Sequence, residues 1–420
     1  MTETYDALET RDPAAREAAL MAALPAHIAQ ARRHSTAMAG WLVGVDADAV
    51  TDRAALARLP VLRKGELLER QKAGRADDPF GGHAAIGWAA LRTPRSARRV
   101  FQSPGPLYEP EGEAPDYWRV ARALHAAGFR AGELVHNSFS YHLTPAGSMM
   151  ETGLHALGCS VFPGGVGNTE LQLQALLDLR PTAYVGTPSF LRILVEKAGE
   201  AGVALPLRRA LVSGEAFPPS LRDWLAGRGI TGHQCYATAD VGLIAYETSA
   251  REGLVVDEGV IVEIVRPGGG EPLPDGEVGE VVVTALNADY PLIRFGTGDL
   301  SAVLPGRCPT GRTNRRLRGW LGRADQTAKV RGMFVHPSQV AEIVRRHAEI
   351  ARARLEIGGE MANDRMTLKA ELRGAAPEGL AQRIAETIRD VTKLRGEVEF
   401  CAPTSLANDG KVIDDTRRLV

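Results

Sequence analysis

The expected fold and site of this chain depend most on two segments. They are YPLIRFGTGDL at residues 290–300 and GRADQTAKVRGMFVHPSQV at residues 322–340. In the first, Gly296 and Gly298 allow turn angles that bulkier residues avoid, so the carboxylate of Asp299 can be fixed at a strand end. The second places Arg323 in a turn before a short strand and a helix that begins at Pro337. We expect these two turns to direct charged side chains at one polyhydroxy ligand, such as a ribose.

Working outward, residues 116–265 alternate between strand-like and helical segments. Strands separated by helices of about 10–15 residues indicate βαβ units and a mainly parallel sheet. Ligands of such sheets bind at the carboxyl ends of the strands. The polar turns VGTP at 185–188, SGEAFP at 213–218 and CYATAD at 235–240 all follow predicted strands. We therefore expect a binding site at that edge.

The pattern of the sequence changes at about residue 253 and again after Gly322. Residues 253–304 alternate apolar and polar positions between Gly/Pro turns, which predicts an antiparallel hairpin or a small barrel. After Gly322 a helix, two strands, a second helix and a third strand predict a small α+β unit. The predicted fold class is therefore α/β: a large domain at residues 1–324 made of parallel βαβ units and a β-rich subdomain, then a mobile α+β lid domain at residues 325–420.

Composition excludes several classes of function. The 420 residues carry a net charge of −1 and only 5% aromatic residues, which argues against binding nucleic acid or an anionic membrane surface. No apolar run approaches the roughly 20 residues of a membrane span. The N-terminus is acidic and the four cysteines form no CxxC pair, so we expect a cytoplasmic protein without a disulfide framework.

Several motifs in order resemble the adenylate-forming (acyl-CoA synthetase) enzymes, and within them the phenylacetate–coenzyme A ligases. They are LPVLRKGELL from residue 59, VGTPSFL from 185, SGEAFPP from 213, CYATADVG from 235, FGTGDL from 295, the GRADQTAKVRG block and the late pair Gly410-Lys411. The resemblance extends from about Leu59 to the C-terminus. It implies an ATP-dependent acid–coenzyme A ligase that uses Mg²⁺ and passes through an acyl-adenylate.

The resemblance also implies roles for individual residues. Asp299 and Arg323 would hold the ribose, Asp240 would bind Mg²⁺, and Lys411 would contact the reacting carboxylate and the α-phosphate. An ammonium at that place stabilises charge that develops in the transition state. Asp325 would be the hinge of the lid. The residues expected to bind adenine and phosphate are Gly214, Glu215, Ala216, Tyr236 and Thr238.

One motif of the family is altered. The family has a Ser/Thr/Gly-rich loop with a lysine that embraces the ATP phosphates, whereas residues 101–112 read FQSPGPLYEPEG. Proline has no amide to donate, and carboxylates repel phosphate, so this loop is poorly built for a triphosphate. Ala239 also replaces a hydroxyl residue of the family pattern, which Thr238 would cover only after a shift in register.

Two further hypotheses concern the acid pocket and a metal. Tyr141 and His142 follow the strand GELVHNSF, where the family lines its acyl pocket, so Tyr141 can pack on an aryl group and His142 can meet a carboxylate. His233, Cys235 and Cys308 offer three zinc ligands without a clear fourth, and buried thiols are the alternative interpretation.

The sequence thus favours a ligase acting on a small carboxylic acid, by analogy an aryl or arylacetic acid. One alternative is a degenerate nucleotide- or acyl-binding homologue with weak or no adenylation. Another is an adenylating enzyme that passes the acyl group to a carrier protein or an amine. The resemblance also indicates a homodimer.

Overall fold

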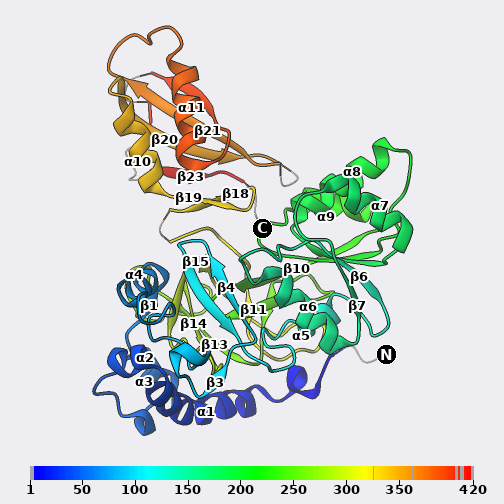
Figure 1. Ribbon diagram of the computed structural model, residues 1–420, viewed down its shortest axis with the longest axis vertical. Helices are drawn as coiled ribbons and strands as arrows, with labels where there is room; N and C mark the ends of the chain where they lie inside the picture. Colours follow the sequence, from blue (N-terminus) through cyan, green and yellow to red (C-terminus); the bar gives the residue numbers. More distant parts are fainter. Residues whose placement is uncertain (1–3, 325, 361–362, 403–404, 407–410, 418–420) are drawn as a thin grey trace.

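The computed structural model describes residues 4–324, 326–360, 363–402, 405–406 and 411–417. It confirms the predicted α/β class, with helices at the N-terminal end, two large sheets in the middle and a C-terminal α/β unit that stands apart in the view of Figure 1. Among the described residues, no helix combines the length and the apolar character that a membrane span requires.

The N-terminal helices pack on one side of the β-rich layer (Figure 1). The helix formed by the alanine-rich stretch begins at Pro13, because the Asp12 side chain accepts hydrogen bonds from the amides of Ala14 and Ala15. Ser35 ends this helix, and its hydroxyl then caps the next one. The helical elements are η1 (Ala7–Thr10), α1 (Pro13–His34), α2 (Thr36–Trp41), η2 (Ala47–Ala49), α3 (Arg53–Ala57) and α4 (Lys64–Gly74).

The larger sheet has nine strands in the order β16-β17-β12-β11-β10-β9-β8-β6-β7. Strands β6 to β10 run parallel, as predicted, and β11, β12, β16 and β17 extend the sheet antiparallel. The parallel strands and their helices are β6 (Leu134–Asn137), β7 (Ser160–Pro163), β8 (Ala183–Gly186), β9 (Arg209–Val212), β10 (Thr231–Thr238), α5 (Ala121–Ala126), α6 (Ala146–Leu157), α7 (Thr169–Leu179), α8 (Pro188–Glu200) and α9 (Pro219–Ala226).

The register of this sheet sets the place of the site. Asn137 pairs with Val185, Gly186 with Val212, and Val212 with Gln234. The carboxyl ends of β6, β8 and β9 therefore lie level with one another along one edge, beside the last residues of β10. Any polar turn that follows one of these strands faces the same space.

The second sheet is smaller and its order is β1-β15-β14-β13. Residues 260–301 form the predicted antiparallel strands, and β1 joins them in parallel. The prediction that residues 253–304 make one unit was wrong in part, because Leu254 pairs with Glu247 and Leu317 of the nine-stranded sheet. The remaining strands and short elements of this half are β1 (Leu62–Arg63), β2 (Ile86–Gly87), η3 (Ala89–Leu91), β3 (Arg95–Ser96), β4 (Arg99–Ser103), β5 (Leu107–Glu111), β11 (Gly242–Glu247), β12 (Leu254–Val256), β13 (Val260–Val265), β14 (Gly279–Ala285), β15 (Phe295–Ser301), β16 (Val303–Leu304) and β17 (Arg316–Leu317).

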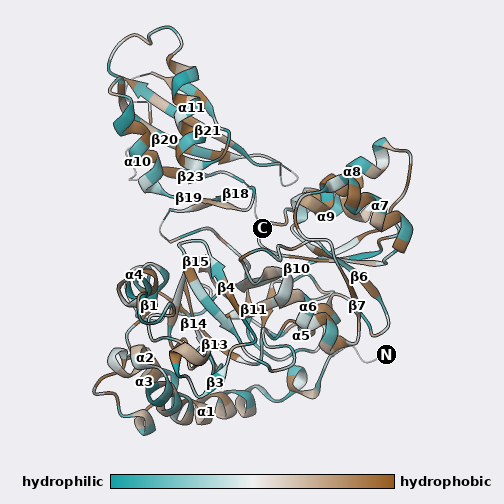
Figure 2. Cartoon of the chain, viewed as in Figure 1, coloured by the Kyte–Doolittle hydropathy of each residue, from teal (hydrophilic) through white to brown (hydrophobic). Residues whose placement is uncertain are grey.

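The C-terminal residues build a core of their own. The buried apolar residues between Ala328 and Ile413 form one cluster, and α10 and α11 each carry hydrophobic and hydrophilic residues on different sides (Figure 2). The mixed sheet has the order β22-β21-β20-β23, of which the last strand was not predicted. The elements are β18 (Ala328–Val330), β19 (Met333–Val335), α10 (Pro337–Arg346), β20 (Ile350–Gly358), β21 (Arg365–Leu372), α11 (Leu380–Thr392), β22 (Glu397–Cys401) and β23 (Ile413–Asp415).

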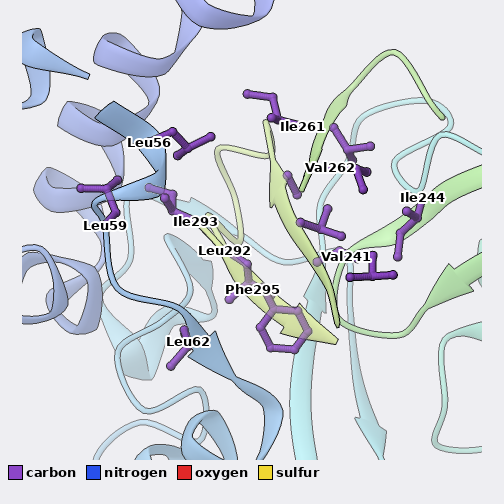
Figure 3. Close-up of a cluster of buried hydrophobic side chains, with 14 of the residues drawn as sticks. Leu56, Leu59, Leu62, Val241, Ile244, Ile261, Val262, Leu292, Ile293 and Phe295 are labelled. Carbon is purple, nitrogen blue, oxygen red and sulfur yellow. The ribbon is translucent and has the colours of Figure 1, made fainter. Parts of the chain in front are cut away.

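A buried arginine lies inside the apolar cluster that joins the N-terminal helices to the smaller sheet. Figure 3 shows Ile293 and Phe295 in this cluster, and Arg294 stands between them in sequence with only 1% of its surface exposed. Its guanidinium donates to both oxygens of Glu263, each at 3.0 Å, and to the backbone carbonyls of Ala57, Leu59 and Gly270. Arg294 therefore holds the N-terminal helices against the sheet through fully paired polar groups.

We expect Arg294→Met to lower the free energy of unfolding by about 3–5 kcal/mol, because Glu263 would stay buried without its partner. Urea denaturation followed by circular dichroism measures the loss. The double variant Arg294→Met/Glu263→Leu should recover a large part of it. A single variant within about 1 kcal/mol of the original chain would contradict the role given to this pair.

Two histidines are buried with neither ring nitrogen paired among the described residues, His83 and His233. Burial, together with Arg70, lowers the pKa of His83 to about 4. Burial, together with Arg251 and Arg222, lowers the pKa of His233 to about 4. Both imidazoles are therefore neutral in the folded chain at neutral pH.

These two pKa values predict how acid destabilises the fold. The unfolded chain protonates these imidazoles below a pH of about 6.5, whereas the folded chain protonates them only near pH 4. The folded state therefore keeps its full stability above pH 6.5 and loses stability as the pH falls toward 4. Each histidine should lower the free energy of unfolding by about 2–3 kcal/mol over that pH range. We expect His83→Leu/His233→Leu to lose less stability than the original chain between pH 7 and pH 4.5 in urea titrations. Parallel pH profiles would contradict this assignment.

Candidate functional site

The carboxylate of Asp299 in β15 is held by three donors from three segments. Its Oδ1 accepts from Trp320 Nε1 and Arg323 Nη1, each at 3.0 Å, and its Oδ2 accepts from the Tyr236 hydroxyl at 2.8 Å. Gly298 has φ +75°, and a Cβ there would lie 2.5 Å from Arg323 Nη2. The strand thus needs glycine at this position so that the guanidinium can pass. The sequence predicted a turn here with Asp299 at a strand end, but Gly298 and Asp299 both lie within β15. The structure brings together Asp299, Arg323 and Tyr236, as the sequence predicted.

The second part of the site is the turn after β9. Gly214 has φ +83°, and Glu215 and Ala216 are half-buried beside it. Glu215 Oε2 accepts from the Ser189 amide at 3.4 Å, and burial raises the pKa of its carboxyl group. The predicted adenine turn therefore lies at the carboxyl edge of the parallel strands, next to the first residues of α8.

The hairpin β18–β19 lies against this turn and brings a lysine that the sequence analysis missed. A Cβ on Gly214 would lie 3.9 Å from Lys329 Nζ, and a Cβ on Gly332 would lie 3.6 Å from Glu215 Oε1. Burial lowers the pKa of Lys329, which Glu215 and Asp299 partly oppose. The resemblance directed attention to Lys411, so the lysine inside the GRADQTAKVRG block itself was overlooked.

Thr238 and Asp240 lie at the turn between β10 and β11. Thr238 Oγ1 accepts from the Val241 amide at 3.3 Å. Asp240 Oδ2 accepts from Lys64 Nζ at 2.9 Å, while its Oδ1 has no partner among the described residues. Lys64, at the start of α4, was not predicted as a site residue.

The altered loop at residues 101–112 forms a closed hairpin. Strands β4 and β5 pair from Arg99 with Glu111 to Ser103 with Leu107, and the turn contains a cis bond between Gly105 and Pro106. Their backbone groups face each other in a ladder, so they are not presented as an open phosphate-binding loop. That this hairpin binds phosphate poorly, as its prolines and carboxylates suggest, stays a prediction.

Glu109 of this hairpin interacts electrostatically with Asp240. The Ser103 hydroxyl donates to its Oε1, and its Oε2 has no partner in the described part of the chain. Burial, together with the charge of Asp240, raises the pKa of Glu109 to about 8. Burial opposes the charge on Lys64, but Asp240 and Glu109 raise the pKa of this ammonium overall.

Tyr141 and His142 follow β6 at the same edge but differ in surroundings. The Tyr141 hydroxyl donates to Glu151 and accepts from Asn137 Nδ2, each at 2.8 Å, and its ring covers Gly147. Burial and Glu151 raise the pKa of this phenol. His142 is exposed. Tyr141 is therefore fixed in place, whereas His142 stands at the surface.

The C-terminal lysine belongs to the α+β unit. Lys411 Nζ donates to Asp414 Oδ1 at 2.9 Å, and the neighbouring Val412 amide donates to Gln326 Oε1 at 2.8 Å. Half of the Lys411 side chain is exposed, at 53%. The predicted hinge, Asp325, lies outside the described residues.

The suggested zinc ligands do not form a metal group. Within the described ranges, no three or more His, Cys, Asp or Glu side chains are placed to hold a metal ion. The Cys308 thiol contacts the hydroxyls of Thr248 at 3.4 Å and Thr310 at 3.1 Å. Cys235 is buried and His233 has no paired nitrogen among these residues, so the thiols fit the alternative of buried core groups.

Comparison with known proteins shows the relatives of this chain. A family model described as AMP-binding enzyme matches residues 139–287, which include the predicted adenine turn and Tyr236. The phenylacetate-coenzyme A ligase of Aromatoleum evansii is 30% identical over 389 residues, covering 86% of this chain and 84% of that protein. The enzyme of the same name from Thermus thermophilus is 32% identical over 317 residues, covering 68% and 70%.

Solved structures show the same fold. The 2-hydroxyisobutyryl-CoA ligase, in complex with its acyl-adenylate and CoA in the thioesterification state, superimposes with a TM-score of 0.81 at 24% identity, over 100% of this chain and 93% of that one. The same enzyme in the postadenylation state gives 0.71 at 25% identity, over 97% and 91%.

The identity over most of both chains, with the motifs in the same order, settles the family. The chain belongs to the phenylacetate–coenzyme A ligase family of adenylate-forming enzymes.

Proposed function

We infer that the chain is an ATP-dependent acid–coenzyme A ligase that uses ATP, Mg²⁺ and coenzyme A. In the first step a carboxylate oxygen bonds to the α-phosphorus of ATP and pyrophosphate leaves, which gives an acyl-adenylate. In the second step the thiol sulfur bonds to the acyl carbon, AMP leaves and the thiol proton is released. The observation that carries the inference is Asp299, held by Tyr236 and Arg323 at the edge where the parallel strands end.

The nucleotide would be bound by the two turns that meet at this edge. Asp299 already accepts three hydrogen bonds, so its carboxylate is oriented before a ribose hydroxyl arrives, and Arg323 lies beside it. A carboxylate fixed in this way recognises vicinal hydroxyl groups with little loss of side-chain entropy. The residues proposed for adenine and phosphate are Gly214, Glu215, Ala216, Tyr236 and Thr238.

The residues present fit a magnesium ion. Mg²⁺ prefers carboxylate oxygens and usually keeps several waters. Asp240 offers a buried Oδ1 that no described residue pairs, close to Thr238 and to the predicted phosphate region. When bound, the ion would neutralise charge on the phosphates. Lys64 holds the other oxygen of Asp240 and so orients the carboxylate.

The two steps would use different lysines of the C-terminal unit. We propose that residues 1–324 and 325–420 are separate domains and that the second rotates about Asp325. The hairpin with Lys329 lies on the Gly214 turn in this structure, which resembles a thioesterification state. Lys411 would enter the site in the other orientation, in which the acid is adenylated. The observed arrangement supports Lys329 as the lysine that faces the adenylate during thioester formation.

The acid is proposed to be an aryl or arylacetic acid. The support is the name of the relatives, phenylacetate-coenzyme A ligases, and the position of Tyr141 after β6, where its ring can form one wall of a pocket. His142 is exposed and would contact the acid only at the mouth of such a pocket. By resemblance we also propose a cytoplasmic homodimer.

One observation favours a second candidate. The closed β4–β5 hairpin lacks the open backbone of a phosphate loop, so a nucleotide- or acyl-binding homologue with weak adenylation is the alternative. Delivery of the acyl group to a carrier protein or an amine would leave the first step unchanged. The acceptor is therefore tested separately from adenylation.

Pyrophosphate exchange separates these candidates and tests the two lysines. The purified chain is assayed with Mg²⁺ for exchange of labelled pyrophosphate into ATP over aromatic and short aliphatic acids. We expect one class of acid to support exchange and Lys411→Ala to slow it by about 10²–10³-fold, because the ammonium stabilises charge in the transition state. Lys329→Met should retain exchange but slow conversion of the acyl-adenylate with coenzyme A.

The matched control is Lys72→Ala, a surface lysine of α4 that pairs with Glu69. It should change neither step. No exchange with any acid, together with measurable binding of ATP or AMP, would overturn the ligase assignment and favour the degenerate binder. Equal losses in both steps for both lysine variants would contradict the division of labour between Lys411 and Lys329.

A further inference from the structure

The segment that follows β6 is held in one conformation by Asn137, whose side chain is completely buried. Its Oδ1 accepts from the Phe139 amide at 3.1 Å. Its Nδ2 donates to the Tyr141 hydroxyl at 2.8 Å and to the Gly147 carbonyl at 2.9 Å. A Cβ on Gly214 would lie 3.8 Å from Phe139 Cε1. The segment that carries Tyr141 therefore borders the turn after β9, at the carboxyl edge of the sheet.

Helix α6 holds the Tyr141 side chain at both of its ends. A Cβ on Gly147 would lie 2.9 Å from Tyr141 Cγ, so the ring packs on a position that has no side chain. One turn further along the helix, Glu151 Oε2 accepts from the Tyr141 hydroxyl at 2.8 Å. Residues four apart lie on the same face of a helix, so Gly147 and Glu151 together form the seat of the ring. Because Tyr141 is only half-buried, part of its ring remains accessible to a ligand.

The charges around this contact fix which group donates. Arg99 Nη2 lies 3.9 Å from Glu151 Oε1 and supplies an opposite charge for the carboxylate. Arg99 is itself anchored, because its Nη1 donates to Ser148 Oγ of α6 at 2.7 Å. Burial and Glu151 raise the pKa of the Tyr141 phenol, so the hydroxyl keeps its proton and donates it to Glu151.

We propose that Glu151 is a positioning residue, whose carboxylate fixes the Tyr141 ring as a wall of the acid pocket and so strengthens the binding of an aromatic acid. A phenylalanine would also pack on Gly147, but only the hydrogen bonds of the hydroxyl hold the ring in one orientation. Contacts between aromatic rings depend on that orientation. The proposal rests on the proposed function for the acid pocket, but not for the contact between Glu151 and Tyr141.

The first measurement is pyrophosphate exchange by the full chain with phenylacetate or benzoate, whichever supports the faster exchange. Glu151→Leu should raise the KM for this acid about 3–10-fold, the range that an oriented aromatic contact is worth. The KM for ATP and the exchange rate at saturating acid should change less than about twofold, because only binding of the acid is weakened. Glu151→Gln, whose amide oxygen still accepts from the phenol, should keep the original KM.

A double-mutant cycle separates positioning from a merely structural role. Tyr141→Phe removes the hydroxyl and should raise the same KM by a similar factor. Adding Glu151→Leu to Tyr141→Phe should cause no further increase, because Glu151 acts only through that hydroxyl. A structural role for Glu151 would give losses that add. The matched control is Glu196→Leu on α8, a carboxylate that pairs with Arg192 four residues earlier and should alter neither KM.

Isothermal titration of phenylacetate and benzoate into the chain with AMP present measures the pocket without chemistry. We expect Glu151→Leu to weaken binding by the same factor as it raises the KM. Binding that Glu151→Leu leaves unchanged, no binding of either acid, or a further loss in the double variant would overturn the proposal. Failure of the proposed function looks different. Acid binding that depends on Glu151, with exchange absent for every acid, would sustain the positioning role and reject the ligase. Exchange with binding that is independent of Glu151 would do the reverse.

Discussion

The carboxylate of Asp299 joins the two sheets of this protein at the site. It lies on β15 of the smaller sheet and accepts a hydrogen bond from Tyr236 on β10 of the larger one. Trp320 and Arg323, which lead into the C-terminal unit, bind its other oxygen. Donors from three separate segments therefore share one acceptor. This carboxylate therefore links the smaller sheet, the larger sheet and the segment that leads to the C-terminal unit.

The buried charged groups of the chain include two clusters that differ in their hydrogen bonding. One is fully hydrogen-bonded, and the other keeps unpaired oxygens near the expected phosphates. Arg294 with Glu263 is fully satisfied and serves the core. Lys64, Asp240 and Glu109 are not, because two free oxygens remain. A buried network that is partly satisfied is costly unless a ligand completes it. The Arg294–Glu263 pair is a structural ion pair, whereas Asp240 Oδ1 is left open for the Mg²⁺ proposed above.

Local patterns in the sequence predicted much of the fold. The alternation of strands and helices over residues 116–265 predicted the parallel strands β6 to β10, although β11 to β13 at its end are antiparallel. The turn expected before Asp299 was wrong, because Gly298 and Asp299 lie within β15. That residues 101–112 bind phosphate poorly, as their prolines and carboxylates suggest, stays a prediction. Strand β23 was missed, because three residues beside β20 form a strand only through their partner. The domain division and the roles of the site residues stay predictions.

The sequence by itself determined what depends on neighbours in the chain: the α/β class, the turns at the carboxyl ends of the strands and the family to which the motifs belong. Only the tertiary structure decided which distant side chains share a site. Lys64 paired with Asp240, and Lys329 against the Gly214 turn, are contacts across long stretches of chain. No local periodicity encodes such contacts, because they arise when separate elements pack together. The charge balance of the site is a property of that packing.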